Sequence, residues 1–380
     1  MKVLYDHQAF EMQKFGGVSN SFVKLIEELP KEIEYNIAIK ESDNVHLKES
    51  AIAVSAPLKC GPGNFITSSH FMGQGRLYEL YSKLFPRFTS YGRNKLYAID
   101  TLIKGEFDIF HPTFFETYFL PYLKGKPFVL TVHDMIPELY FPRRDLQVRT
   151  KPILCEKAAH IVVVSKKTKQ DLVEMLHVPE EKVTVIYHGA PSSCTNSFSK
   201  RQIQGRYILY VGQRGLYKNF FPMLKSLLPI FQNYPDIKLV CTGPNFSKKE
   251  KQCFQSWGVK DKIVHIYVSD TELYNLYANA LCFIYPSAYE GFGIPILEAY
   301  RANCPVLLNH SSCFPEIALN AAVYFHLDDN TSDLTRVMND FLHMTTKERE
   351  ELIDKQQKRM MAFSWKESAK KLADVYTSIL

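Results

Sequence analysis

The stretch that decides the fold is YPSAYEGFGIPILEA, residues 285–299, which ends an apolar run and opens a glycine turn. Glu290 stands directly before Gly-Phe-Gly-Ile-Pro, and Glu298 follows eight residues later. If a helix begins near Ile294, Glu298 lies in its first turns and Glu290 on the turn before it. Two carboxylates in one segment are typical of glycosidase catalysts, of metal ligands or of an ordinary helix surface, so the rest of the sequence must decide between them.

Short apolar runs rich in β-branched residues recur along the whole 380-residue chain and alternate with longer amphipathic stretches. Runs that are apolar on both faces and alternate with helices are typical of parallel strands in a doubly wound α/β fold. Six runs precede a polar interval: KVLYDH, YNIAIK, DIFHPT, FVLTVHD, HIVVVS and VTVIYHG. Six follow it: ILYVGQ, KLVCTG, IVHIYV, LCFIYPS, PVLLNH and AVYFH. The sequence therefore predicts two such domains.

The polar interval APSSCTNSFSKRQIQ, residues 190–204, clusters Pro, Ser and Asn without periodicity and is typical of a linker. The predicted domains are therefore residues 1–190 and 205–360. Residues 361–380 form an amphipathic terminal helix that is free to pack back on the first domain. Ligands of open parallel sheets bind beyond the carboxyl ends of the strands, so two facing domains would enclose a substrate in the cleft between them.

Composition excludes several classes of protein. A net charge of +6 with 23% charged residues falls short of the signature of a nucleic-acid binder. The eight cysteines include no CxxC pair, and several lie in apolar runs, as expected of buried thiols in a reducing compartment. The N-terminus has Asp6 and His7 where a signal peptide needs apolar residues, and no apolar run approaches the roughly 18 residues of a membrane span. We therefore expect a cytoplasmic protein.

Polar clusters follow four of the predicted strands. They are Asp6-His7 with Gly16-Gly17 beyond it, His133-Asp134, residues 212–218, and residues 287–293. A single strand-end histidine or glycine turn is most often structural. Four clusters in one chain, all at the edge where parallel sheets bind ligands, favour a functional site.

The segment YVGQRGLYKNF has the chemistry of a phosphate site. A glycine turn after a strand leads past Arg214 and Lys218 to a predicted helix start, where backbone N–H groups attract anions. The alternative is a pair of solvated surface cations. The segment matches neither GxGxxG nor a Walker loop, so NAD and ATP are poorly supported. For the carboxylates, the eight-residue spacing favours hydrogen bonds to different hydroxyls of one long ligand, and Gly291 and Gly293 allow its close approach.

Taken together, these motifs resemble those of family 4 glycosyltransferases, retaining enzymes with the GT-B fold of two Rossmann-like domains facing across a cleft. PSAYEGFGIPILEA resembles their Glu, seven residues, Glu signature. YDHQAFEMQKFGGVSNSF resembles the amino-terminal glycine loop of bacterial polysaccharide members, and TVHDMIPELY their strand-end histidine motif. YVGQRGLYKN resembles their phosphate site, although Arg214 stands one residue later than the family's usual arginine.

The resemblance implies a role for each of these residues. Glu290 would contact hydroxyls of the donor sugar and Glu298 the nucleotide ribose. Arg214 and Lys218 would hold the diphosphate, with help from the backbone amides of Phe292, Gly293 and Ile294. Gly17 would let the first domain approach the donor phosphates, and His133 would contact the sugar at the reacting centre. No metal and no cofactor beyond the nucleotide-sugar co-substrate is expected, since the two cations supply the electrostatic stabilisation.

The implied function is the transfer of a sugar from a nucleotide diphosphate to a hydroxyl of a glycan or lipid-linked glycan, with retained anomeric configuration, in bacterial polysaccharide assembly. The first domain would be the acceptor side and the second the donor side. On resemblance alone GDP-mannose is the preferred donor, and UDP-glucose, UDP-GlcNAc and dTDP-rhamnose types stay open. The alternatives are a non-catalytic GT-B subunit that binds a glycan or scaffolds a partner, and a sugar-nucleotide epimerase.

One segment lies outside these motifs, at residues 75–97. Its apolar residues Leu77, Leu80, Tyr81 and Leu84 share a helical face. Its cations are Arg76, Lys83, Arg87, Arg93 and Lys95, set against Glu79 alone. Both an interfacial helix at the inner face of a membrane and an ordinary domain helix with a solvated face have this composition.

Overall fold

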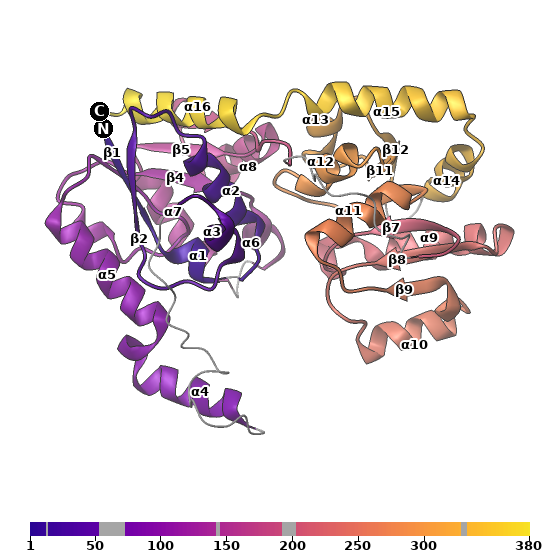
Figure 1. Ribbon diagram of the computed structural model, residues 1–380, viewed down its shortest axis with the longest axis horizontal. Helices are drawn as coiled ribbons and strands as arrows, with labels where there is room; N and C mark the ends of the chain where they lie inside the picture. Colours follow the sequence, from indigo (N-terminus) through magenta and orange to yellow (C-terminus); the bar gives the residue numbers. More distant parts are fainter. Residues whose placement is uncertain (13, 53–72, 142–144, 192–202, 328–332) are drawn as a thin grey trace. The chain divides into compact units, whose positions relative to one another are not determined.

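Parallel strands alternate with helices throughout the described chain. The computed structural model describes residues 1–12, 14–52, 73–141, 145–191, 203–327 and 333–380 (Figure 1). All twelve predicted strands are present in these residues, and every pairing between them is parallel, which confirms the α/β prediction. Residues 192–202 of the predicted linker lie outside the described residues.

The chain divides into two compact units. The first comprises Met1–Val164, Thr168–Tyr187 and Trp365–Leu380. The second comprises Ser165–Lys167 and His188–Ser364. The first unit is therefore built from both ends of the sequence.

The first unit holds six strands in two three-stranded sheets, ordered β2-β1-β3 and β4-β5-β6. An isolated bridge between Phe110 and Phe128 joins β3 to β4. The strands are β1 (Lys2–Asp6), β2 (Glu34–Ala38), β3 (Ile109–His111), β4 (Val129–Val132), β5 (His160–Val163) and β6 (Val183–Val185). The α-helices are α1 (Gln8–Met12), α2 (Gly17–Glu27), α3 (Val45–Glu49), α4 (Gln74–Leu84), α5 (Ser90–Lys104), α6 (Ile136–Tyr140), α7 (Gln147–Lys157), α8 (Lys166–Leu176) and α16 (Trp365–Ser378). Short 3-10 turns are η1 (Pro86–Phe88), η2 (Leu120–Tyr122) and η3 (Glu180–Lys182).

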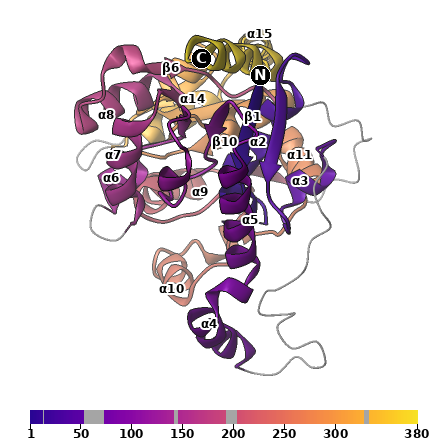
Figure 2. The ribbon, with the colours of Figure 1, turned by 90° about the vertical axis from the view of Figure 1, so that its left-hand side faces the viewer.

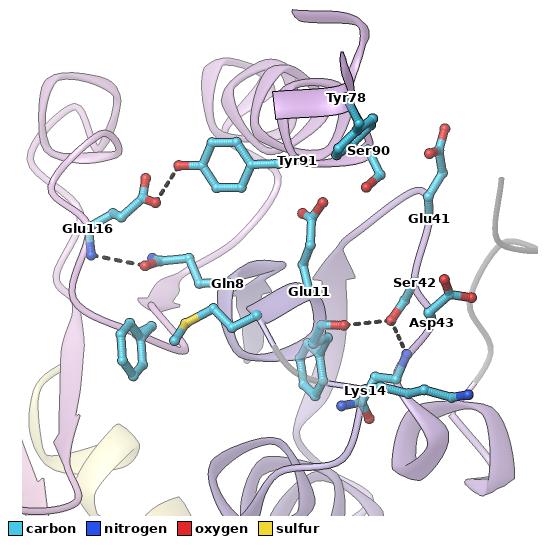
Figure 3. Close-up of a pocket in the computed structure, with 14 residues that line it drawn as sticks. Gln8, Glu11, Lys14, Glu41, Ser42, Asp43, Tyr78, Ser90, Tyr91 and Glu116 are labelled. Atoms are coloured by element: carbon cyan, nitrogen blue, oxygen red, sulfur yellow. Dashed lines mark hydrogen bonds between the residues drawn. The ribbon is translucent and has the colours of Figure 1, made fainter. Parts of the chain in front are cut away.

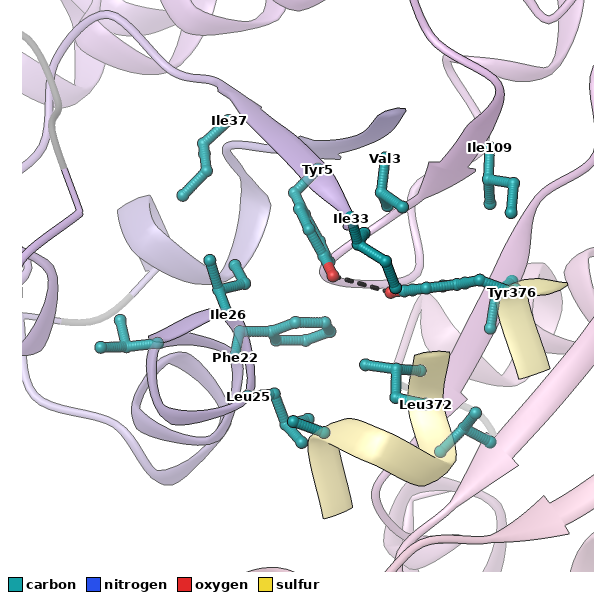
Figure 4. Close-up of a cluster of buried hydrophobic side chains, with 14 of the residues drawn as sticks. Val3, Tyr5, Phe22, Leu25, Ile26, Ile33, Ile37, Ile109, Leu372 and Tyr376 are labelled. Carbon is teal, nitrogen blue, oxygen red and sulfur yellow. Dashed lines mark hydrogen bonds between the residues drawn. The ribbon is translucent and has the colours of Figure 1, made fainter. Parts of the chain in front are cut away.

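Helix α16 forms one wall of the core of the first unit (Figure 4). Its apolar side packs with α2 and β1, where Tyr376 lies near Tyr5 and Phe22. The hydroxyls of Tyr5 and Tyr376 are 2.7 Å apart, and the Tyr376 hydroxyl also lies 2.6 Å from Nδ1 of His111. Buried polar atoms need such partners, so this hydrogen-bonded chain fixes α16 against the sheet.

The second unit has one six-stranded sheet, ordered β12-β11-β10-β7-β8-β9. Its strands are β7 (Arg206–Tyr210), β8 (Ile237–Cys241), β9 (Ile263–His265), β10 (Cys282–Tyr285), β11 (Val306–Asn309) and β12 (Val323–Phe325). Its helices are α9 (Phe220–Asn233), α10 (Lys248–Ser256), α11 (Asp270–Asn279), α12 (Ile294–Arg301), α13 (Phe314–Ala318), α14 (Leu334–Leu342) and α15 (Thr346–Met360). The 3-10 turns are η4 (Leu216–Lys218) and η5 (Lys260–Lys262).

The strand order of each unit reverses at one point. In the second unit the chain winds outward from β7 through β8 and β9, then returns to the other side of β7 with β10. In the first unit β1 lies between β2 and β3. Ligands of doubly wound sheets bind outside the carboxyl ends of the strands at such a switch point. The fold therefore favours ligand binding at the loops after β7 and β10 in the second unit, and at those after β1 and β3 in the first.

Candidate active site

In the second unit, the loops that follow β7 and β10 meet at the switch point. The amide of Ala288 donates to the carbonyl of Tyr217 over 2.7 Å, which joins the two loops. Gly212 after β7 has φ +116° and packs against Gly243, where an added Cβ would stand 2.6 Å from the Gly212 carbonyl oxygen. Only glycine fits at this contact, because the two backbones touch.

Lys218 and Glu290 form an ion pair across these loops. The Nζ of Lys218, at the end of η4, lies 2.5 Å from Oε1 of Glu290, and both side chains are largely buried. The ammonium group also lies 4.9 Å from the centre of the Tyr217 ring. The structure thus brings together two residues predicted for the site, with opposite charges in direct contact.

Neighbouring groups hold Glu290 in place. Its amide donates to Oγ of Ser312 over 3.2 Å, and the same hydroxyl donates to the Glu290 carbonyl over 2.8 Å. Burial raises the pKa of the Tyr285 hydroxyl, and the Glu290 carboxylate adds to the rise. Tyr285 therefore stays protonated beside a carboxylate that is fixed from several sides.

Helix α12 begins at Ile294, as predicted. Gly293 caps it with φ +92°, and an added Cβ would meet side-chain carbons of Ile296 at 3.1 Å and Phe314 at 3.2 Å. The ring of Phe292 is buried against His188 and Phe363, so its backbone amide is the part suited to a ligand. A helix N-terminus preceded by glycine attracts anions, as the predicted phosphate role of these amides requires.

Glu298 lies one turn into α12. Its Oε2 accepts a hydrogen bond of 3.1 Å from the hydroxyl of Tyr277 on α11. The two glutamates thus stand on different supports, Glu290 on the loop and Glu298 on the helix behind it. This arrangement suits contacts to separate parts of one ligand.

Arg214 has a partner that the sequence did not indicate. Its Nε donates to Oε1 of Glu250 over 2.7 Å, and its Nη2 donates to the carbonyls of Pro244 and Asn245. The other carboxylate oxygen of Glu250 accepts from the amide of Ser247 and so closes the capping box of α10. Arg214 therefore ties the phosphate-site loop to the start of α10, and its role on a diphosphate stays a prediction.

The first unit positions the other two predicted residues. Gly17 is the first residue of α2, after the cap residue Gly16. His133 directly follows β4, and its ring lies 5.9 Å from that of Phe22 on α2. Burial, with a smaller effect of the Lys151 ammonium, lowers the pKa of His133 to about 4. The histidine is thus uncharged near neutral pH.

A cavity of about 340 Å³ opens at the switch point of the first unit (Figure 3). Its walls come from α1, the loop after β2, α4, α5 and the loop after β3. Its carboxylates are Glu11, Glu41, Asp43 and Glu116. Three of them are paired: Glu41 with Arg93 at 2.6 Å, Glu116 with Lys95 at 3.1 Å and Asp43 with Lys48 at 3.2 Å. Burial raises the pKa of Glu11, although Asn94 donates to its Oε2 over 2.9 Å.

Two family models divide the sequence between them. Residues 15–193 match the model described as Glycosyltransferase Family 4, and residues 195–359 match Glycosyl transferases group 1. The chain belongs to glycosyltransferase family 4. The predicted resemblance is therefore confirmed.

Curated relatives of this family 4 member include two O-antigen enzymes. O-antigen chain mannosyltransferase RfbU of Salmonella typhimurium is 30% identical over 58% of this chain and 62% of the relative. O-antigen chain mannosyltransferase B of Escherichia coli is 28% identical over 54% of this chain and 58% of the relative. The matches thus span about three fifths of the length of these relatives.

Solved structures share the fold over the whole length. HepE of Anabaena, solved with UDP and glucose, superposes with a TM-score of 0.73 at 16% identity, covering 100% of both chains. Sucrose-phosphate synthase of Thermosynechococcus elongatus gives 0.73 at 16% identity, covering 100% of this chain and 99% of that one. These neighbours confirm the GT-B fold class.

Sequence reasoning missed several residues that shape both sites of this family 4 member. Three residues form hydrogen bonds with predicted site residues: Ser312 with Glu290, Tyr277 with Glu298 and Glu250 with Arg214. None of the three lies in a sequence motif that would indicate its partner. The walls of the first-unit cavity were also missed, although Glu11 lies inside the quoted glycine-loop segment. Among the described residues, no group of His, Cys, Asp and Glu gathers to hold a metal ion, and no helix has the length and apolar character to cross a membrane.

Proposed function

We propose that the chain is a retaining glycosyltransferase that transfers a sugar from a nucleotide diphosphate to a hydroxyl of a glycan or lipid-linked glycan. The Lys218–Glu290 pair carries the proposal. It lies at the switch point of the second unit, beside the glycine-capped start of α12. A cation suited to a phosphate and a carboxylate suited to sugar hydroxyls thus lie together at the edge where such sheets bind ligands.

Donor binding exchanges partners within this pair. The diphosphate takes the ammonium of Lys218 and the amides at the start of α12, which frees Glu290 to accept hydrogen bonds from the sugar. Glu298 accepts hydrogen bonds from the ribose. Arg214 binds the diphosphate only if it leaves Glu250. Its contribution to donor binding is therefore smaller than that of Lys218.

Transfer proceeds on the face of the leaving group. The bond between the anomeric carbon and the diphosphate oxygen breaks, the acceptor oxygen bonds to that carbon, and the acceptor proton passes to the departing phosphate oxygen. Positive charge develops on the sugar, and the uncharged His133 contacts it without repulsion. The cations take the electrostatic role of a metal, so turnover should persist in EDTA. A loss that Mg²⁺ or Mn²⁺ restores would contradict this.

Mannose, carried by GDP, is the preferred donor sugar, supported by the two O-antigen mannosyltransferases among the relatives. The cavity of the first unit is the proposed acceptor site, since its carboxylates suit sugar hydroxyls. Six free cysteines in the described residues, five of them buried, agree with the reducing cytoplasm as the proposed setting. Thermal shifts with GDP-mannose, UDP-glucose, UDP-GlcNAc and dTDP-rhamnose would identify the donor, because a ligand of the native state raises its melting temperature.

The deciding experiment compares Glu290→Gln with Glu298→Gln. Glu290→Gln should lower turnover most without weakening the affinity for free nucleoside diphosphate, because the diphosphate no longer competes with the Glu290 carboxylate for Lys218. Glu298→Gln should weaken that affinity by about 1–3 kcal/mol, the cost of a lost charged acceptor. Calorimetric titration of both variants measures the difference, and equal losses of affinity would contradict the assignment.

The competing functions predict different products. A non-catalytic subunit would bind the donor without turnover, and an epimerase would convert it without an acceptor. Release of nucleoside diphosphate only when acceptor is present identifies a transferase.

A further inference from the structure

Helix α4 and the turn η1 carry large apolar side chains that are about half exposed. Both Figure 1 and Figure 2 show α4 standing apart from the strands of the first unit. Its large apolar side chains are 41% to 63% exposed. They are Leu77, Leu80, Leu84, Phe85 and Phe88, which together we call the α4 surface. An exposed apolar patch of this kind marks an interaction site.

Three cations flank the α4 surface. Arg76, Lys83 and Arg87 are all exposed, and Glu79 is the only acid between Gln74 and Phe88. None of the three forms an ion pair with another described residue. The other two cations of the segment are occupied, since Arg93 bonds Glu41 and Lys95 bonds Glu116. The free charge of this surface is therefore positive.

We propose that the α4 surface docks on an anionic lipid bilayer. An exposed helix with leucine and phenylalanine on one side and cations beside them inserts its apolar side at the level of the headgroups, where the cations meet lipid phosphates. A second copy of the chain is the poorer occupant, because pairing the same surface with itself brings the same three cations together.

Docking through α4 would bring the cavity of the first unit close to the membrane. Tyr78 of α4 lines the cavity beside Tyr91 of α5 (Figure 3). Docking through Leu80 and Leu84, on the same helix, holds this cavity beside the bilayer. A glycan attached to a membrane lipid would then reach the cavity without leaving its leaflet. The docking itself does not depend on the transfer reaction.

Vesicle binding tests the proposal without any assay of activity. The full chain should bind vesicles of phosphatidylglycerol and phosphatidylcholine in sedimentation, bind pure phosphatidylcholine at least tenfold more weakly, and dissociate as salt rises. The variant L80Q/L84Q should lose tenfold or more of its binding. The variant R76Q/K83Q should lose about thirtyfold, from about 1 kcal/mol for each cation near the surface.

Matched controls lie on the second unit. Met361→Gln removes an apolar side chain that is 80% exposed, and Lys347→Gln removes a cation whose side chain is 85% exposed. Both should bind vesicles like the wild type. All variants change exposed side chains, so each should unfold at the wild-type temperature and bind nucleoside diphosphate with the wild-type affinity. These two measurements verify that each variant is folded.

Three outcomes would overturn the proposal. The first is equal binding to anionic and neutral vesicles, or none. The second is undiminished binding by L80Q/L84Q and R76Q/K83Q. The third is a lipid-free dimer in sedimentation velocity that L80Q/L84Q dissociates, which would assign the α4 surface to a second copy.

Discussion

At the scale of single residues, the pairing of Lys218 with Glu290 makes donor binding an exchange of partners. We predict that Lys218→Ala weakens the binding of nucleoside diphosphate by about 1.5–3 kcal/mol, the usual worth of a hydrogen bond to a charged group. The substitution also leaves Glu290 without its cation, so turnover should fall together with affinity. Calorimetric titration and steady-state kinetics measure the two effects.

The control for this prediction is Lys225→Ala, which removes an exposed lysine from α9 of the same unit. It should change neither quantity. Wild-type kinetics in Lys218→Ala would remove that residue from the site.

Gly293 has a left-handed backbone conformation, with φ +92°, that strains any other residue placed there. We predict that Gly293→Ala destabilises the second unit by more than the roughly 1–2 kcal/mol of a left-handed backbone alone, because the added Cβ also crowds Ile296 and Phe314. Gly258→Ala is the matched control, since Gly258 has φ +68° and open space around its Cβ. Urea denaturation of both variants separates the two costs, and equal losses would show that crowding contributes nothing.

The partners of charged residues were beyond sequence reasoning. Arg214 and Glu250 lie 36 residues apart, and Lys218 and Glu290 lie 72 apart. Each pairing arises only because the sheet brings separate loops together at one edge. The chemistry of Lys218 and Glu290 was visible in the sequence, but the contact between them was not.

At the scale of elements, the hydrogen-bonded chain that joins α16 to β1 and β3 contains a buried histidine. Burial, with a smaller effect of His133, lowers the pKa of His111 to about 3. In the unfolded chain the imidazole has a pKa near 6.5, so between about pH 6.5 and pH 3 the unfolded chain binds a proton that the folded unit does not bind. This contribution to stability is therefore full above pH 6.5 and is lost as pH falls toward 3.

We predict that lowering the pH from 7.5 to 5 costs the first unit about 2 kcal/mol through His111, the linkage expected for such a shift. His111→Gln should start less stable, since His111 bonds Tyr376 and Thr131, but lose less on acidification. Urea denaturation at both pH values measures the difference. His326→Gln removes an exposed histidine of the second unit and is the control, so the acid-induced loss of stability in the first unit should stay as in the wild type.

Elements were more predictable than their partners. Strands such as VLTV and CFIY are buried on both faces, so nearly the whole run is apolar and stands out in the sequence. The division of the first unit into two sheets was not visible, because β3 and β4 meet through a single bridge that leaves no mark on composition. The separate helix α4 was likewise indistinguishable from a packed domain helix.

At the scale of the whole molecule, the first unit depends on the last residues of the chain. We predict that deleting Trp365–Leu380 exposes the core of the first unit, because α16 supplies one of its walls. Hydrogen exchange should then show lost protection in β1–β3 and retained protection in β7–β12. The deleted chain should still bind nucleoside diphosphate through the second unit. Loss of protection in both units would contradict this independence.

The contribution of both chain ends to one unit also sets the order of folding during synthesis. A ribosome releases α16 after the whole of the second unit, so the first unit lacks a wall of its core until then. The second unit, whose strands lie wholly within the interior of the sequence, has all of its own residues earlier. We therefore expect nascent chains of this protein to reverse the common order in which the N-terminal domain folds first. Until α16 is synthesised, the first unit exposes apolar core residues, so we expect it to need protection from aggregation.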